Sequence, residues 1–126
     1  MTEPPVLIVI PCLNEEAHLR AVVDSLLNPL PAMPVQLVIA DGGSTDGTRK
    51  IAEDLMQCYP QIIWLDNPKR IQAAAVNLAV ERYGRAGGIL IRADAHNVYP
   101  PHYVDMLSAD MQSTGADSVT VPMTTI

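Results

Sequence analysis

The sequence predicts an α/β protein built on a parallel β-sheet with helices on both faces. Short runs of β-branched residues alternate with segments whose apolar residues recur at helical spacing. The segments that join them are short, as expected for right-handed βαβ crossovers within one sheet. The chain has 126 residues, of which 48% are hydrophobic, but it has no Phe and one Trp, so a single aliphatic core is expected.

The first strand and helix are predicted between residues 6 and 27. Residues 6–10 form a continuous apolar run closed by Pro11, which is the pattern of a strand buried on both faces. Asn14 is expected to cap the following helix, with Glu15 favoured near the positive end of that helix. The apolar stripe of this helix consists of Leu19, Val22, Val23, Leu26 and Leu27.

The second strand is predicted at residues 35–40, where another apolar run indicates burial on both faces. The loop "DGGSTDGT" follows it and leads into the second helix. Ser44, Thr45 or Asp46 is expected to cap this helix. Its apolar stripe consists of Ile51, Ala52, Leu55 and Met56. The loop is neither GxGxxG nor a Walker sequence, so a dinucleotide-binding or ATP-hydrolysing function loses its main support.

The remaining residues continue the alternation. Residues 62–65 predict a third strand, 89–91 a fourth and 118–122 a fifth. The third helix has the stripe Ile71, Ala74, Ala75, Leu78 and Ala79, and the fourth has the stripe Tyr103, Met106, Leu107 and Met111. The predicted order is βαβαβαβαβ, forming one domain over residues 1–126.

Composition excludes several classes of partner. The formal charge is −6 with only eight Lys and Arg residues, which argues against nucleic acid and assigns any bound phosphate to a small molecule. Cys12 and Cys58 lack metal-site or redox spacing and are interpreted as reduced core residues of a cytoplasmic protein. No segment is long enough to span a membrane, so membrane association would depend on parts outside this chain.

Polar residues follow each of the first four predicted strands. In open α/β sheets, ligands bind beyond the carboxyl ends of the strands, near the point where strand order reverses. If the first strand is central, Asp41 and Asp94 lie about 10 Å apart across a nucleotide-sized crevice, with residues 11–14 as its floor. The alternative is structural, with Asp41 ending a strand and the acids of the second loop capping a helix.

Asp94 and His96 are the strongest candidates for a metal site. In an extended segment, residues two apart point the same way, so a carboxylate oxygen and an imidazole nitrogen here can share one divalent cation. His18 and His102 are interpreted as solvated residues instead.

Four motifs together resemble the nucleotide-sugar-binding part of the family 2 glycosyltransferases: "VLIVIPCLNEEAHL", "VIADGGSTDGT", "NPKRIQAAAVNLAV" and "ILIRADAH". "RADAH" and the ending "ADSVTVPMTTI" look most similar to bacterial exopolysaccharide glucosyltransferases of the succinoglycan-biosynthesis type. The resemblance implies the GT-A fold, a Rossmann-like sheet. It covers the whole chain, which would then stop after the fifth strand and before the acceptor-binding half.

The resemblance also implies roles for particular residues. Asp94 and His96 match the first and last positions of the DxD motif, which holds Mg²⁺ or Mn²⁺ against the diphosphate, and Asp94 is counted as catalytic through that cation. The nucleoside and the nucleotide would be contacted by Pro11, Asn14, Glu15 and Asp41, and by Lys69, Arg70 and Asn77. Asp41 would accept a hydrogen bond from the base.

Two positions depart from the family pattern. Gly42 stands where relatives often carry the second acid of the DDGS element, so one carboxylate must serve there. His96 replaces the last acid of DxD, which removes a negative charge and favours Mn²⁺ over Mg²⁺ because imidazole is a softer ligand.

The expected function is a metal-dependent, inverting glycosyltransferase that uses a nucleoside-diphosphate sugar, with UDP as the expected nucleotide. Its acceptor would be a saccharide or a lipid-linked saccharide in polysaccharide biosynthesis, at the inner face of the cell membrane. The first alternative is a nucleotide-sugar-binding fragment without turnover, because the acceptor site and the catalytic base would lie beyond Ile126. A nucleotidyltransferase would need a glycine-rich, basic loop after the first strand, where "PCLNEE" is acidic. An exposed fifth strand is expected to promote homo-oligomers.

Overall fold

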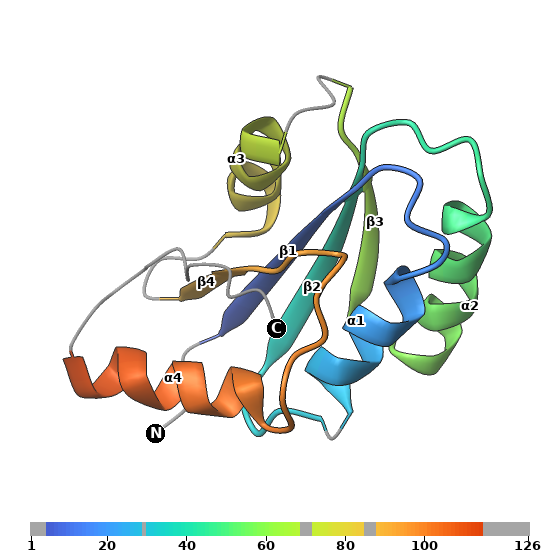
Figure 1. Cartoon of the computed structure of the whole chain (residues 1–126). Coiled ribbons are helices and arrows are strands. Elements are labelled where there is room, and N and C mark those ends of the chain that lie inside the picture. Colours follow the sequence, from blue (N-terminus) through green and yellow to red (C-terminus); the bar gives the residue numbers. More distant parts are fainter. Residues whose placement is uncertain (1–4, 29, 69–71, 85–87, 115–126) are drawn as a thin grey trace.

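The computed structural model describes residues 5–28, 30–68, 72–84 and 88–114. Four parallel strands form one sheet in the order β3-β2-β1-β4 (Figure 1). The strands are β1 (Val6–Cys12), β2 (Val35–Asp41), β3 (Ile62–Asp66) and β4 (Ile89–Arg92). The helices are α1 (Leu19–Leu27), α2 (Thr48–Cys58), α3 (Gln72–Tyr83) and α4 (Tyr103–Thr114). The predicted α/β class and the central position of the first strand are confirmed.

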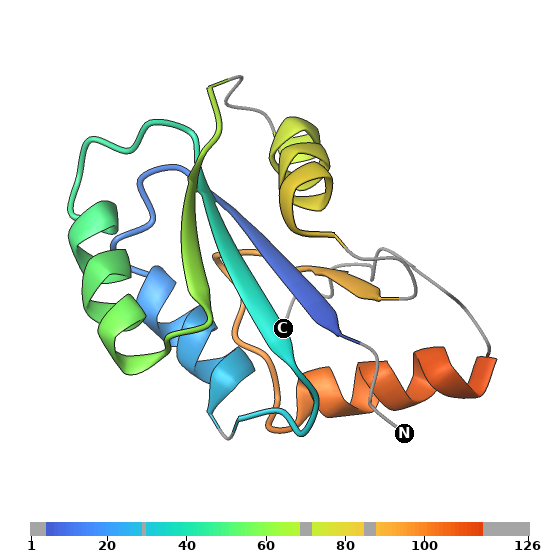
Figure 2. The ribbon, with the colours of Figure 1, turned by 180° about the vertical axis from the view of Figure 1, so that it is seen from behind.

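Helices cover both faces of the sheet, as predicted. Side chains alternate along β1, so Leu7 and Val9 face α3 while Ile8 and Ile10 join a larger core with α1, α2 and α4. The two views from opposite sides show α3 apart from the other three helices (Figure 1, Figure 2). All five residues of the predicted α1 stripe are buried, from Leu19 to Leu27.

The start of α1 differs from the prediction. Asn14 does not cap this helix, because its backbone is left-handed, with φ 53°, and its side chain is used elsewhere. The cap residue is His18, which makes no side-chain capping bond, and the Glu15 carbonyl accepts from the N–H groups of His18 and Leu19. The residue before α2 is Gly47, which has no side chain to cap the helix, while Asp46, one of the three predicted residues, accepts from the Thr48 N–H in the first turn.

The predictions for Met106 and Cys58 are wrong, and three others concern parts of the chain that the structure does not describe. Met106 is 55% exposed, because the buried stripe of α4 passes through Val104 and Ser108 at helical spacing. Cys12 is buried, but Cys58 lies exposed at the end of α2, and both thiols are free. The predicted fifth strand at 118–122, Met111 as a core residue and Ile71 lie outside the described residues or side chains.

None of the helices in the described part of the chain combines the length and the apolar character needed to cross a membrane.

Candidate functional site

The loops that follow β1, β2 and β3 lie at one edge of the sheet, because parallel strands end together (Figure 1). β1 and β2 are in register through Cys12 and Asp41, and β2 and β3 through Asp41 and Asp66. The loop after β4 approaches from the other side of β1, since β4 pairs with β1 along Val6–Val9. β1 is therefore the strand at which the direction of winding reverses, where ligands of such sheets bind.

Asn14 fastens the loop after β1 to the loop after β2. Its N–H donates to Ser44 Oγ (2.8 Å), and its Oδ1 accepts from the N–H of Thr45 (2.8 Å) and of Asp46 (3.3 Å). The left-handed backbone suits asparagine, which tolerates positive φ better than most residues. Asn14 therefore shapes the site through these hydrogen bonds, in addition to the substrate contact predicted for it.

A second set of bonds, through Thr48, lies beneath this one. Thr48 is fully buried, and its Oγ1 accepts from the Glu15 N–H (2.8 Å) while donating to Asp46 Oδ1. The hydrogen bond from Thr48 lowers the pKa of Asp46 below its ordinary value. One buried hydroxyl therefore ties the end of the first loop to the start of α2.

Asp41 is a buried carboxylate, 5% exposed, that organises the loop after β2. Its Oδ2 accepts from the N–H groups of Gly43 (2.9 Å) and Ser44 (2.8 Å), and its Oδ1 accepts from the Ser44 hydroxyl. Gly43 has φ 103°, a conformation that L side chains rarely adopt, so glycine is required at this turn. Asp41 thus stabilises the loop, in addition to the ligand role predicted for it.

Beside Asp41 is a cavity of about 290 Å³ at the carboxyl ends of β2 and β3. Asp66, Asn67 and Pro68 line its other side, and the Asn67 N–H donates to the Asp41 carbonyl (2.7 Å). Neither Asp66 nor Asn67 was predicted as a site residue. The signal was present in "DNPK", a polar stretch directly after a buried strand, but local sequence does not show which of these side chains adjoin Asp41.

Asp94 and His96 are held in one tight turn after β4. Asp94 Oδ1 accepts from the His96 N–H (2.8 Å), and the Asp94 N–H donates to the hydroxyl of Tyr99 (2.9 Å). Tyr99 is 4% exposed, and this burial raises the pKa of its phenol. The turn thus orients the Asp94 carboxylate, while the His96 side chain remains 62% exposed.

His96 also meets the loop after β1. Its Nε2 lies 2.8 Å from Glu15 Oε2, and its ring lies 4.8 Å from the ring of His18, measured between centroids. Glu15 is 9% exposed, so the contact joins a mostly buried carboxylate to an exposed imidazole. The structure therefore brings together two predicted residues, Glu15 and His96, with His18, which was expected only to be solvated.

The other predicted residues are less closely joined to this group. Pro11 is half-buried in β1 opposite Ala40. Asn77 is exposed on α3, and no hydrogen bond links it to another of the described site residues. Lys69 and Arg70 lie outside the described residues.

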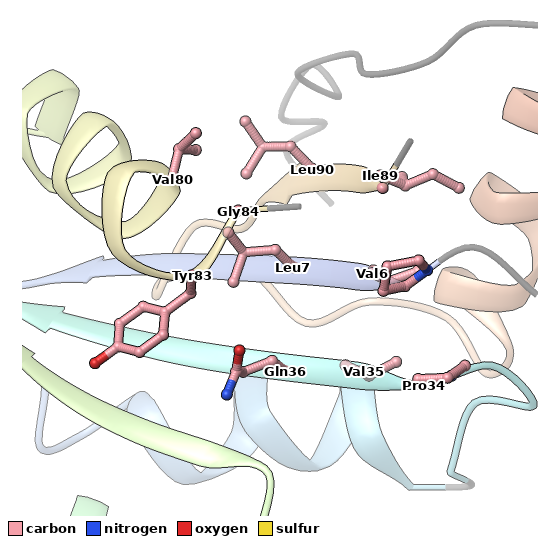
Figure 3. Close-up of a pocket in the computed structure, with 12 residues that line it drawn as sticks. Val6, Leu7, Pro34, Val35, Gln36, Val80, Tyr83, Gly84, Ile89 and Leu90 are labelled. Atoms are coloured by element: carbon pink, nitrogen blue, oxygen red, sulfur yellow. The ribbon is translucent and has the colours of Figure 1, made fainter. Parts of the chain in front are cut away.

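A larger cavity, of about 480 Å³, lies at the opposite end of the sheet (Figure 3). Its lining is mostly apolar and includes Leu7, Val80, Tyr83 and Leu90, with Gln36 as a polar member. The described residues that line it include none of the carboxylates or imidazoles found at the other edge. Volume alone therefore does not identify the site, and the chemistry lies at the carboxyl ends of the strands.

The fold is shared with solved structures of S. aureus TarS. S. aureus TarS 1–349 superposes with a TM-score of 0.65 at 17% identity, covering 90% of this chain and 33% of that one. TarS 1–349 in complex with UDP-GlcNAc gives a TM-score of 0.65 at 18% identity, covering 90% and 32%. At these identities the likeness establishes the fold class alone, and it confirms the predicted one.

Sequence comparison establishes the family. Residues 7–126 match glycosyl transferase family 2, and the chain belongs to that family. It is 52% identical over 126 residues to the succinoglycan biosynthesis protein ExoA of Rhizobium meliloti (strain 1021), covering all of this chain and 38% of ExoA. It is 25% identical over 120 residues to the glycosyltransferase AglE of Haloferax volcanii, covering 94% of this chain and 39% of AglE. The chain thus spans about two fifths of the length of these relatives.

Proposed function

We propose that this chain is the donor-binding part of a glycosyltransferase that transfers a sugar from a UDP-sugar to a saccharide or lipid-linked acceptor in polysaccharide biosynthesis. The 52% identity to a succinoglycan biosynthesis protein supports this setting. The observation that carries the proposal is the junction of three loops at the reversal point of the sheet, where Asp41 adjoins a cavity and Asp94 and His96 lie across β1. The complete protein would act in the cytoplasm, at the inner face of the membrane.

UDP is the proposed nucleotide. One solved structure with the same fold, TarS 1–349, is described as a complex with UDP-GlcNAc and another as a complex with UDP. In this chain the nucleoside would occupy the cavity beside Asp41, where Asp66 and Asn67 add polar groups. Pro11 and Asn14 do not line this cavity and would instead form the floor of the crevice between Asp41 and Asp94, with Arg70 and Asn77 approaching the nucleotide.

The charge at this edge is the physical reason for a divalent cation. Glu15, Glu16, Asp41, Asp66 and Asp94 all lie in or next to the loops, so a diphosphate would meet carboxylates. Like charges repel strongly where solvent is partly excluded, and a cation between them removes that repulsion.

Asp94 and His96 fit this ion in their chemistry. Their donor set is one oxygen and one nitrogen, and the Asp94 carboxylate is already oriented by the His96 N–H. The mixed set favours Mn²⁺ over Mg²⁺. When bound, the cation would neutralise the charge that develops on the departing diphosphate, which is the role proposed for Asp94 in catalysis.

Transfer would invert the anomeric carbon, with a carboxylate deprotonating the acceptor hydroxyl. No described residue is assigned as that base. The chain covers 38% of ExoA, and this favours a second candidate function for the chain by itself, in which it binds the donor without turnover. Sugar-transfer assays beside binding assays separate the two, since a binding fragment would transfer nothing.

Titration calorimetry of UDP into the chain tests the donor site. We expect binding with Mn²⁺, weaker binding with Mg²⁺ and none with chelator. Asp94→Asn should lose the Mn²⁺-dependent binding, because the neutral amide is a poor cation ligand. Asp54→Asn, which changes an exposed aspartate on α2, is the matched control and should bind like the unaltered chain.

GDP and ADP serve as comparison nucleotides in the same experiment. UDP binding that survives chelation, or that Asp94→Asn leaves intact, would refute the assignment of the cation. If no nucleotide binds to chain that circular dichroism shows to be folded, the donor site as proposed here is wrong.

A further inference from the structure

Glu15, His18 and His96 converge on one point beside the proposed donor site. Each offers one ligand atom, and these three atoms lie within 4.8 Å of one another. Glu15 Oε2 and His96 Nε2 are 2.8 Å apart. Glu15 comes from the loop after β1, His18 from the first residue before α1, and His96 from the turn after β4.

The Glu15 carboxylate carries an independent sign of an absent ligand. Glu15 is 9% exposed, and its Oε1 is fully buried with no hydrogen-bond partner among the described residues. Burying a polar atom without a partner is costly, and the cost is greatest when the group is charged. A cation bound to this carboxylate would offset that cost.

The ligand set matches zinc better than magnesium or manganese. Two imidazoles and one carboxylate, with a further coordination position left open, form a three-ligand set of the kind zinc adopts. Tetrahedral coordination at ordinary zinc bond lengths places ligand atoms roughly 3.3 Å apart. The observed separations, from 2.8 Å up to 4.8 Å, bracket this value. Both histidines are exposed, so their side chains have room to rotate toward this spacing.

The backbone around the three residues is already fixed. The Glu15 N–H is held by the buried Thr48 hydroxyl, and the His96 N–H by Asp94. We propose that Glu15, His18 and His96 form a binding site for a zinc-class divalent cation, with a ligand set different from the Asp94 and His96 pair.

Occupancy of this site has a consequence that rests on the proposed function. His96 belongs to both ligand sets, so a zinc ion held with Glu15 and His18 withdraws His96 from the cation of the donor. Zinc should therefore oppose Mn²⁺-dependent UDP binding rather than support it. The site would make the enzyme sensitive to the ratio of the two metals.

The first test uses metal alone, on tag-free chain. Zn²⁺ calorimetry and the visible absorption of bound Co²⁺ should show one ion per chain in tetrahedral coordination, with no comparable uptake of Mg²⁺. His18→Asn should weaken Zn²⁺ binding by about tenfold or more, because it removes one ligand. Asparagine is a favoured helix cap, so this variant should fold normally.

His102→Asn is the matched control, because His102 is also an exposed histidine before a helix and its φ of 63° is tolerated by asparagine. It should bind Zn²⁺ like the unaltered chain. Glu15→Gln should weaken Zn²⁺ binding as His18→Asn does, without a change in side-chain size. Absence of Zn²⁺ binding, or equal binding by His18→Asn, would overturn the site.

The second test adds UDP and Mn²⁺. Zn²⁺ should reduce UDP binding by the unaltered chain and have little effect on His18→Asn. Zn²⁺ that leaves UDP binding unchanged would overturn the competition. If UDP does not bind at all, the proposed function fails, while the metal-alone experiment still decides the zinc site.

Discussion

Cys12 is a thiol packed at the end of β1 beside the acidic edge of the sheet. It is 5% exposed, and burial raises its pKa far above the ordinary value. The negative charges of Glu15, Asp41 and Asp46 raise the pKa further. Burial therefore favours the protonated thiol in the folded protein, a form unsuited to act as a nucleophile or a metal ligand.

This burial predicts a loss of stability at alkaline pH. Below the ordinary thiol pKa of about 8.5, the folded and unfolded chains both keep the proton, so Cys12 contributes no pH dependence. Above that value only the unfolded chain releases it, and the free energy of unfolding should fall by about 1.4 kcal/mol per pH unit. Urea unfolding between pH 7 and 10 measures this slope. Tyr59, Tyr99 and Tyr103, whose pKa values are also raised by burial, add to the slope only as the pH approaches the ordinary tyrosine pKa of about 10.

Cys12→Ala should lack this slope, whereas Cys58→Ala, at an exposed position, should retain it. A Cys12→Ala variant with the same pH dependence as the unaltered chain would show that another group is responsible.

At the scale of elements, the site depends on how the start of α2 is joined to the end of β1. A helix start leaves backbone N–H groups without partners inside the helix. Asp46 Oδ1 accepts from the Thr48 N–H (2.9 Å), and Glu16 Oε2 accepts from the Gly47 N–H (3.0 Å). Each of the two loops thus supplies a hydrogen-bond partner that the first turn of α2 lacks, and these bonds join the loops to each other through the helix.

Thr48→Val should destabilise the protein by about 1–3 kcal/mol, because it leaves the Glu15 N–H without its buried partner. Valine has nearly the same shape and the same branched Cβ, so the change tests the hydroxyl alone. Loss of that hydroxyl should also raise the pKa of Asp46 toward its ordinary value, which NMR titration of its carboxyl can follow.

Thr45→Val provides the comparison, since Thr45 is exposed in the same loop, and it should change the free energy of unfolding by less than about 0.5 kcal/mol. Equal effects of the two substitutions in urea unfolding would mean that the hydroxyl of Thr48 is not the important contact.

At the scale of the whole molecule, the architecture was predictable because its signals are local. A continuous apolar run such as residues 6–10 is typical of a strand buried on both faces of a covered parallel sheet, and this run forms the first five residues of β1. The general rule for strand ends predicts a site at the carboxyl ends of the strands, and Asp41 and Asp94 lie at or just beyond the ends of β2 and β4. The described residues confirm the strand, and the role of the two acids stays a prediction.

The details of the site were not predictable because they depend on contacts between distant segments. Asn14 has the residue type of a helix cap, but its bonds to Thr45 and Asp46 place it in a different role. His18 is exposed, as expected, yet only the folded chain brings it next to His96. No local pattern in the sequence indicates that the loops after β1 and β4 contact each other.

The strand order also sets an order of assembly. Val6 donates its N–H to the Pro34 carbonyl near the start of β2, whereas Ala93 donates to the Val9 carbonyl from just beyond β4. Closing the shorter loop costs less entropy, so β1 and β2 should pair first. In pulsed hydrogen exchange during refolding, the Val6 amide should gain protection before the Ala93 amide. Protection of both in a single phase would contradict this order.

During synthesis the same strand order leaves β1 exposed for a long interval. β1 is made before the other three described strands, and β2 covers one of its edges soon afterwards, but the partner for its other edge, β4, is the last of the four to be made. An unpaired apolar strand edge readily pairs with other chains. The nascent protein is therefore most vulnerable to aggregation between the emergence of β2 and that of β4, when a chaperone would protect it most.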